Sequence, residues 1–409
     1  MTRIMKMINV ALLLSMSQVM GQSLTLPKAE EIALQNNPSI QAANLNIELA
    51  RQQKRSAAEF GKFAVTWTTG EYNSVNRDNN YTFTQTVPFP AALSSQLGVA
   101  KAEMIRAEKE KAVTAIELVY QVREAYYHLA FLQASQKILR QQDSLFAGFA
   151  EAAAIRFRTG ESTLLEKANA ESQSLEIKNQ LRQNDFDIQM AETELQRLLK
   201  SQDPPQIASE FTERTLPNGL DTTSLRANPQ LSYLQQQIEI QHRAKRAEVA
   251  KMLPDILIGY FNQSLVGYQN IGGQDQYFDA SKRFQGFQLG LAFPLWFAPA
   301  VAKIKSASIN QEIARTQKKQ YDNNLKSNFK QTLQALDKGM ITLNYYKSTA
   351  LPNAKLILDQ AEKSYRAGEI GYMEYMQSIR NAIGIKLGNL QALYDYNRTI
   401  IKLEFLLGQ

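Results

Sequence analysis

Two segments of the chain repeat one arrangement of an aromatic–basic pair, a glycine and two acids. They are RFRTGESTLLEKANAE at residues 156–171 and SYRAGEIGYMEYMQSI at residues 364–379. In each segment one acid follows the glycine directly, and a second acid, Glu166 or Glu374, lies six residues after it. Carboxylates that gather at a narrow opening raise the local concentration of cations. If assembly brings these two glutamates to one narrow opening, they form a cation-attracting site; otherwise both lie on the solvated outer face of a helix.

Residues suited to catalysis or metal binding are scarce in the rest of the chain. The sequence has no cysteine and two histidines, His128 and His242. The lack of cysteine excludes disulfides and thiolate metal sites. Two isolated histidines in helical patterns indicate side chains on helix faces, not a metal or acid–base site. We therefore expect no catalytic residue, no metal site and no cofactor, and we expect that the protein is not an enzyme.

Residues 1–21 have the pattern of a secretory signal peptide. Arg3 and Lys6 precede an apolar run at residues 8–16, and small residues follow before Gln22. This run is shorter than the roughly 20 residues that a helix needs to cross a bilayer, and no later stretch is long and apolar enough. The remaining charges are mixed, without the basic and aromatic arrays of nucleic-acid-binding proteins. We expect an exported protein that enters a membrane, if at all, as strands.

Internal similarity extends along most of the remaining chain. The recurring landmarks are Asn37-Pro38 and Asn228-Pro229, Phe89-Pro90 and Phe293-Pro294, and Gly160 and Gly368. They predict two structural repeats, residues 22–201 and residues 226–409, joined by an irregular linker at residues 202–225. Each repeat is expected to contain a helix, two strands, a long helix, a turn and a further helix.

The predicted strands alternate apolar and polar residues. KFAVTWT and YTFTQTVPF form the first pair, and segments around residues 256–260 and 287–291 form the second, with a loop at residues 265–283. The candidate membrane-facing residues are Phe63, Val65, Trp67, Phe287, Leu289 and Leu291. A soluble hairpin with one buried face would show the same alternation. The export signal and the aromatic residues near the strand ends favour a membrane location.

A membrane location sets a strict condition on assembly. Four strands cannot close a barrel, and an open sheet edge cannot lie in lipid. Several chains would therefore have to share one barrel. The helices are expected at residues 27–60, 91–158 and 299–366, with a kink at Pro352 in the last. Helices this long are typical of coiled coils.

With these features the chain resembles the TolC family of outer-membrane efflux channels. The resemblance rests on NNPSI and ANPQL, on the strand pairs that end in PFP and AFPLW, and on the two repeated segments. LPNAKLILDQAEKSYRAGEI and REAYYHLAFLQASQKIL are most similar to the branch that serves heavy-metal resistance pumps of the cobalt-zinc-cadmium or copper-silver types. The implied fold is mainly α with a small β part: a long coiled-coil α-barrel and a shared membrane β-barrel.

The resemblance also implies an assembly and a location. Three chains would supply 12 strands to one barrel in the outer membrane of a Gram-negative bacterium, with a helical tunnel extending into the periplasm. The implied partners are two further copies of the chain, a periplasmic adaptor protein, an inner-membrane pump of the RND type and outer-membrane lipid, with no nucleic acid. The cargo would be metal cations or other small toxic solutes.

Under the same resemblance the repeated segments are the turns at the periplasmic end. The adaptor-docking residues would be Arg156, Phe157, Gly160, Glu161, Tyr365, Arg366, Gly368 and Glu369. The gate would comprise Glu166, Tyr365, Ile370 and Glu374. The best-known gate of the family has an arginine where this chain has Ile370, so an ionic latch at that position is not expected here.

Two other functions are compatible with parts of the pattern. A channel of this kind can also serve as the exit duct of a type I protein secretion system. A periplasmic coiled-coil adaptor belongs to a different class, and it would need a lipoyl-like β domain beside a single helical hairpin. The sequence has no such domain, which favours the channel.

Overall fold

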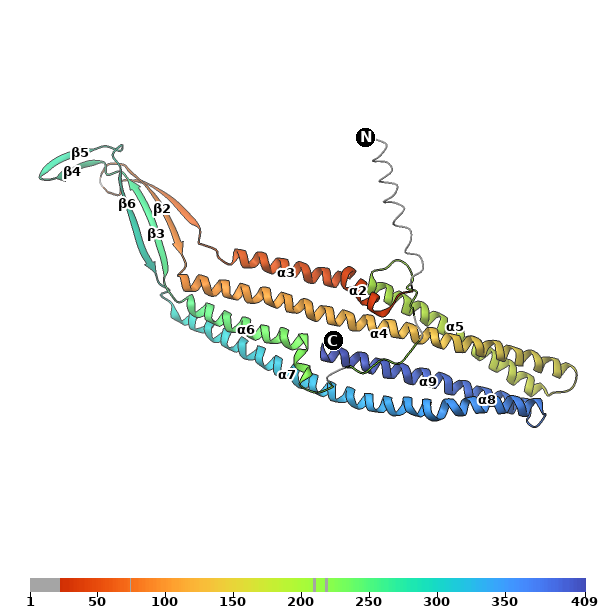
Figure 1. Ribbon diagram of the computed structural model, residues 1–409. Coiled ribbons are helices and arrows are strands. Elements are labelled where there is room, and N and C mark those ends of the chain that lie inside the picture. The colour runs from red at the N-terminus through yellow and green to blue at the C-terminus, as the bar shows by residue number, and fades with distance from the viewer. Residues whose placement is uncertain (1–22, 74, 209–210, 218–219) are drawn as a thin grey trace, which may run out of the picture. The chain divides into compact units, whose positions relative to one another are not determined.

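The computed structural model describes residues 23–73, 75–208, 211–217 and 220–409. The predicted signal peptide at residues 1–21 lies outside these residues. The elements, in chain order, are α2 (Leu26–Asn36), α3 (Pro38–Ser56), β1 (Phe63–Gly70), β2 (Asp78–Val87), α4 (Pro90–Arg158), α5 (Leu164–Leu199), η1 (Ser224–Ala227), α6 (Pro229–Ala250), β3 (Asp255–Gln263), β4 (Gly267–Ile271), β5 (Gln274–Phe278), β6 (Phe284–Ala292), α7 (Phe297–Tyr345), η2 (Tyr346–Ala350), α8 (Leu351–Arg366) and α9 (Tyr372–Leu407) (Figure 1). The predicted fold class, mainly helical with a small strand part, is confirmed.

The chain divides into two compact units, which are described separately. Unit 1 comprises residues 1–41, 112–229 and 323–409, and unit 2 comprises residues 42–111 and 230–322. Long helices contribute to both units, because α4 and α7 each pass from one to the other. The division of the sequence into two repeats with a linker remains a prediction.

The main core of unit 1 lies between α2, α4 and α5. Its largest fully buried side chains include Leu129, Leu195 and Leu198, and Tyr126 donates its hydroxyl to the carbonyls of Leu24 and Ala208. The helices α4 and α5 run side by side (Figure 1). The predicted long helix at residues 91–158 is confirmed as α4, in which Gly98 and Gly148 are tolerated.

The recurring Asn-Pro pairs act at the ends of helices in unit 1. The predicted helix at residues 27–60 is wrong in one respect, because it is broken at Asn37 into α2 and α3. Asn37 is extended (φ −70°, ψ 130°), the conformation that a following proline favours. Its amide donates to the Leu198 carbonyl at 2.9 Å, and the amide of Asn228 donates to the Leu406 carbonyl at 3.0 Å. Each asparagine therefore satisfies a carbonyl in the last turn of α5 or α9.

The predicted helix at residues 299–366 contains a π-turn. Residues 346–350 (η2) form it immediately before Pro352, between α7 and α8. Proline cannot donate a hydrogen bond to the carbonyl four residues earlier, and one extra residue in the turn accommodates its ring. The ring of Tyr346 then passes over Gly388 of α9, where a Cβ would lie 3.0 Å from the Tyr346 Cζ. Lys347, in the same turn, pairs with Glu213.

A largely buried ionic cluster joins four parts of unit 1: α2, α4, the segment after α5, and α9. Glu404, near the end of α9, accepts from Arg123 Nη1 at 2.9 Å and from Arg214 Nη2 at 2.6 Å. Arg123 also donates to Glu30 at 2.7 Å, and the guanidinium of Arg214 lies 5.1 Å from the centre of the Tyr127 ring. Two carboxylates and two guanidinium groups thereby compensate one another within the folded unit.

The strands of unit 2 form a sheet in the order β1-β2-β3-β6, antiparallel throughout. Direct cross-strand pairs join Val65 to Phe83, Phe83 to Tyr260 and Tyr260 to Phe287. Paired residues share a face of the sheet. Aromatic rings therefore form a row across all four strands: Phe63 contacts Phe83 at 6.0 Å, Phe83 contacts Tyr260 at 6.2 Å and Tyr260 contacts Phe287 at 5.5 Å between ring centres.

The predicted loop at residues 265–283 is wrong in part, because it contains the two-stranded sheet β4–β5. Gly272 and Gly273 link the strands with φ of 62° and 87°. Two consecutive positive φ angles are typical of the tight turn that matches the twist of a hairpin. Tyr268 and Tyr277 pair across the strands with ring centres 5.3 Å apart. Because this segment is rich in Gly, Asn and Gln, its sequence did not show the apolar alternation that predicts a strand.

Candidate functional site

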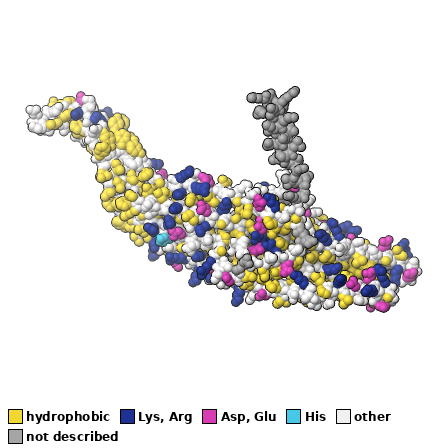
Figure 2. Space-filling view, in the orientation of Figure 1, with side chains coloured by type: hydrophobic (Ala, Val, Ile, Leu, Met, Phe, Trp, Pro, Cys, Tyr) yellow, Lys and Arg dark blue, Asp and Glu magenta, His cyan; other side chains and the backbone are white. Residues whose placement is uncertain are grey.

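The apolar face of the four-stranded sheet is exposed. All six predicted membrane-facing residues lie on this one face, since the register pairs Ile258 with Leu289 and Ile256 with Leu291. Phe287 is 86% exposed and Trp67 is 63% exposed. Figure 2 shows hydrophobic side chains gathered over the strands. An exposed apolar face of this extent marks a surface that contacts a partner or lipid.

The opposite face of the sheet is built mostly from small and polar residues. It includes Thr66, Thr82, Thr84, Gly259, Gln288 and Gly286. At Gly286 a Cβ would lie 2.8 Å from the ring of Phe261, its direct cross-strand partner, so that ring requires the glycine. The outer strands β1 and β6 each pair on one side only within the described chain. Their free edges can accept further strands.

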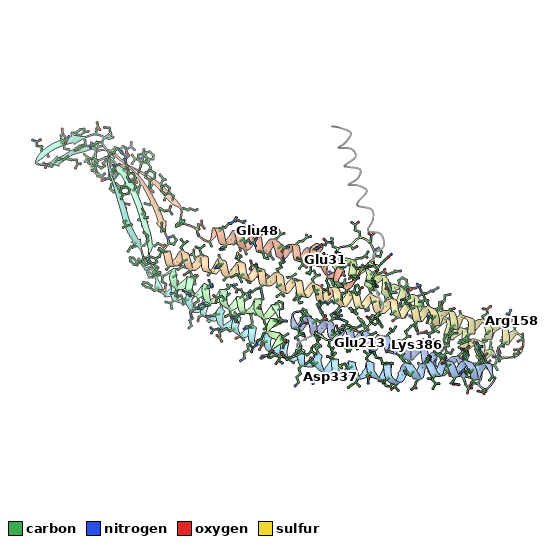
Figure 3. The ribbon with its side chains drawn as sticks, in the orientation of Figure 1. Glu31, Glu48, Arg158, Glu213, Asp337 and Lys386 are labelled. Atoms are coloured by element: carbon green, nitrogen blue, oxygen red, sulfur yellow. The ribbon has the colours of Figure 1, made fainter. Side chains whose placement is uncertain are left out.

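The first repeated segment forms the turn between α4 and α5. Arg158 marks the end of α4 (Figure 3). The Gly160 amide donates to the Phe157 carbonyl at 3.2 Å and the Glu161 amide donates to the Arg156 carbonyl at 2.8 Å. With φ of 78° at Gly160, this is a Schellman motif. The glycine is required by its backbone conformation, because a Cβ there would meet no atom within 4 Å.

The second repeated segment forms the same motif between α8 and α9. The Gly368 amide donates to the Tyr365 carbonyl at 3.1 Å and the Glu369 amide donates to the Ser364 carbonyl at 2.9 Å, with φ of 75° at Gly368. The Glu369 carboxylate also accepts from the Ser364 hydroxyl at 2.8 Å. The two repeated segments therefore form turns with the same pattern of backbone hydrogen bonds.

The second acid of each segment lies in the first turn of the next helix. Thr163 caps α5 by accepting from the Glu166 amide at 3.2 Å, and Glu374 accepts from the Gly371 amide at 3.1 Å, as the third residue of a capping box does. Carboxylates at these positions stabilise a helix N-terminus. The position of these acids, six residues after each glycine, is therefore explained by their role in capping the next helix. The predicted role in attracting cations stays a prediction.

Aromatic side chains join the two turns. The guanidinium of Arg156 lies 5.8 Å from the centre of the Tyr372 ring, and the Tyr372 hydroxyl donates to the Phe149 carbonyl. Tyr365 stacks on Tyr375 with ring centres 4.6 Å apart. Burial, followed by the proximity of Tyr365, raises the pKa of Tyr372, so its hydroxyl stays protonated and remains a donor.

The predicted gate residues have different surroundings. Tyr365 belongs to the aromatic group, together with Tyr372 and Tyr375, which sequence reasoning missed although both lie inside the repeated segment. Ile370, which lies between Gly368 and Gly371 in the sequence, is half-buried. Arg366 pairs with Glu362 on the exposed side of α8. Contacts between aromatic rings, and not an ion pair at position 370, therefore hold the second turn.

No helix in the described part of the chain is both long and apolar enough to span a membrane. Comparison with curated protein sequences gives no match. Residues 31–200 match the family described as outer membrane efflux protein.

Solved structures of similar fold cover nearly the whole chain. A membrane protein from Pseudomonas aeruginosa is 18% identical, with a TM-score of 0.79 over 93% of this chain and 90% of that chain. The Campylobacter jejuni CmeC outer membrane channel is 14% identical, with a TM-score of 0.76 over 94% and 85%. The Vibrio cholerae outer membrane protein VceC is 18% identical, with a TM-score of 0.75 over 94% and 96%. At these identities the likeness shows the fold.

The sequence match covers part of the chain, and the fold likeness covers nearly all of it. The matched residues include α4, the first repeated segment and α5, and the fold likeness covers at least 93% of the chain. Residues 31–200 therefore match the outer membrane efflux protein family, and the chain shares the fold of solved outer-membrane channels.

Proposed function

We propose that this chain is the outer-membrane exit duct of a tripartite efflux system. The observation that carries the proposal is the exposed apolar face of the four-stranded sheet, with Phe287, Leu289 and Trp67 open to the surroundings. Lipid is the environment in which such a face is stable. Strands of 8 to 10 residues are close to the length that a tilted membrane strand needs.

The free edges of this sheet require further strands, and the resemblance to the TolC family implies that three chains supply them. Unpaired backbone groups at β1 and β6 cannot remain in lipid. If β6 of one copy pairs with β1 of the next, three copies form a closed barrel of 12 strands and leave no edge. The match of residues 31–200 to the outer membrane efflux protein family supports this arrangement.

The helices provide the periplasmic part of the duct under this proposal. α4 has 69 residues, and a helix of that length measures about 100 Å. The turns at Gly160 and Gly368 would form a ring of six at the far end. There they would dock a periplasmic adaptor that joins the duct to an inner-membrane pump of the RND type. The exposed Arg158 and Arg366, which precede the two glycines, suit contact with a polar partner.

The cargo that we infer is metal cations or other small toxic solutes. This inference rests on the resemblance of residues 351–370 to the heavy-metal branch and on the acids Glu166 and Glu374 near the turns. A duct formed by 12 helical columns is wide and selects weakly among solutes. The pump would therefore determine the cargo.

Assembly and conduction test the proposal directly. The protein purified in detergent should have the mass of a trimer, and planar bilayers should show stable single channels. A monomer that remains soluble and fully helical without detergent would contradict the proposal.

Docking is tested with glycine substitutions. Gly160→Asp and Gly368→Asp should leave trimers in the outer membrane but abolish resistance to the pump's cargo and crosslinking to the adaptor. Gly148→Asp is the matched control, because Gly148 lies on an exposed helical surface with open space around its Cβ position and without a positive φ. Resistance retained in both turn variants would show that the turns are not the docking surface.

A further inference from the structure

Three cross-strand pairs between β3 and β6 each join a glycine to a larger residue. They lie on the face of the sheet opposite to the exposed apolar residues, and they are Phe261–Gly286, Gln288–Gly259 and Leu257–Gly290. None of the three glycines has a positive φ. Their backbone conformation therefore does not require glycine, and the reason for the missing side chains lies in the space around them.

The ring of Phe261 leans over Gly286. A Cβ added to Gly286 would lie 2.8 Å from both the Cε1 and the Cζ of this ring. The Cβ atoms of directly paired residues are about 4.5–5.5 Å apart, and a side chain in a strand usually stands roughly perpendicular to the sheet. A perpendicular ring would hold its outer atoms farther from Gly286 than its own Cβ is. The ring therefore lies across the gap between the strands, in the space that the missing side chain leaves.

The side chain of Gln288 leans in the opposite direction, from β6 toward β3. A Cβ added to Gly259 would lie 3.1 Å from the Oε1 of Gln288, which is the outer end of that side chain. The same Cβ would lie 3.3 Å from the Cγ2 of Thr84 on β2. Gly259 and Gly286 thus each leave room for one large side chain to lie flat on the sheet.

Phe261 has no other position in which it could lie flat. Its direct partner on β2 is Thr82, and Gln263 follows it on the same face of β3, and both carry side chains. Gly259, which precedes it on that face, is covered by the side chain of its own cross-strand partner. A Cβ at position 286 would therefore turn the ring away from the sheet, because non-bonded carbon atoms cannot remain 2.8 Å apart.

The same face of the sheet carries almost no charge. The charged residues of its four strands are Asp78 and Asp255, the first residues of β2 and β3. Because β2 and β3 are antiparallel, these two acids lie at opposite ends of the sheet. Rings of charged side chains are one means by which a pore selects ions by charge. The middle of this face, which has no such side chains, is suited to limiting solutes by size.

We propose that Gly259 and Gly286 set the width of the bore, the space that the 12 strands of the proposed trimer would enclose. This inference rests on the proposed function, which turns the face opposite to lipid toward the bore. With both glycines present, Phe261 and Gln288 lie flat against the wall, and the bore admits bulky solutes of either charge. A side chain at either glycine would raise a ring or an amide of each chain into the passage.

Single-channel recording in planar bilayers, with polyethylene glycols of graded size, tests this inference. Gly286→Ala should lower the conductance and exclude polymers that wild type admits, and adding Phe261→Ala to that variant should restore both properties. Gly290→Ala is the matched control on the same strand and face. Its Cβ would lie 3.6 Å from the side chain of Leu257, an ordinary contact, so this variant should match wild type.

Phe261→Ala alone gives a second readout that does not depend on whether the sheet tolerates a new Cβ. A ring that lies flat obstructs little, so its removal should leave the conductance close to that of wild type. A clear rise in conductance would overturn the inference, even if Gly286→Ala fails to assemble. Equal conductance and equal polymer exclusion in wild type and Gly286→Ala would also overturn it and leave the proposed function intact. Absence of channels in wild type would contradict the proposed function, and this inference with it.

Discussion

The ring of Tyr365 lies parallel to the ring of Tyr375, with centres 4.6 Å apart and an interplanar angle of 0°. The two residues belong to different helices, α8 and α9, and they flank the turn at Gly368. Tyr375 also meets Phe149 of α4 edge to face at 5.4 Å. The stack therefore connects the turn at Gly368 to α4, the helix that precedes the turn at Gly160.

Removing this stack should loosen the packing of α8 and α9 beside the turn at Gly368. An aromatic pair contributes about 0.5–1.5 kcal/mol beyond the area that it buries. Tyr375→Leu should lower the unfolding midpoint slightly and increase single-channel conductance in planar bilayers, whereas Tyr375→Phe, which keeps the ring, should match wild type. Equal conductance in all three proteins would exclude a role for the stack in narrowing the channel at the Gly368 turn.

Glu374 allows the capping role to be separated from the charge. Glutamine also accepts from the backbone in a capping box. Glu374→Gln should therefore keep the stability of α9 and lower cation selectivity, and Glu374→Ala should lose both, with a stability loss of about 1 kcal/mol. Reversal potentials in asymmetric salt and thermal unfolding measure the two effects. Unchanged selectivity in Glu374→Gln would restrict this glutamate to capping.

The ionic cluster should respond strongly to a single substitution. Removing one partner of a buried pair costs about 3–5 kcal/mol, because the remaining charges stay buried. Glu404→Gln leaves both Arg123 and Arg214 without this partner and should lower the thermal midpoint clearly. Glu362→Gln breaks an exposed pair with Arg366 and should cost less than about 1 kcal/mol. Similar midpoints for the two variants would argue against a structural role of the cluster.

His128 should make stability depend on pH. Burial lowers its pKa, while Asp187 and Glu124 oppose and Arg398 reinforces the shift. Its Nδ1 lies 3.0 Å from the Tyr394 hydroxyl. The unfolded chain, with a pKa of about 6.5, binds the proton more readily. The stabilisation is therefore complete above about pH 6.5 and is lost as the pH falls through the folded-state value.

Thermal midpoints measured across this pH range test the role of His128. His128→Gln should remove part of the decline on acidification, and His242→Gln, which replaces an exposed histidine, serves as the matched control. An acid-induced decline in His128→Gln equal to that of wild type would assign the effect to other groups.

Much of the fold could be predicted from local patterns. The glycines at 160 and 368 indicated turns because a positive φ is a local backbone property, and the alternation around Trp67 indicated a strand with one apolar face. The shared face of Phe63 and Phe287 followed once the register was known, and no single strand could give it. Register depends on pairing between distant segments.

The misjudged features depend on interactions that a linear pattern does not record. At the break, the side-chain amide of Asn37 donates a hydrogen bond to the carbonyl of Leu198 in another helix. The β4–β5 hairpin consists of polar residues, so no hydrophobic period marked it. Tyr372 and Tyr375 were visible in the sequence, but their contacts with Arg156 and Tyr365 arise only when α4, α8 and α9 come together.

The π-turn at residues 346–350 changes the phase of its helix. One additional residue rotates everything downstream by about 100° about the helix axis. Ala354 and Ala361, the buried residues of α8, are aligned for packing only because that rotation has occurred. Deleting a single residue here would therefore turn charged side chains toward α9, whereas a substitution such as Ser348→Ala would preserve the alignment. Natural relatives that lack this extra residue would need their apolar positions shifted by one along the whole of the following helix.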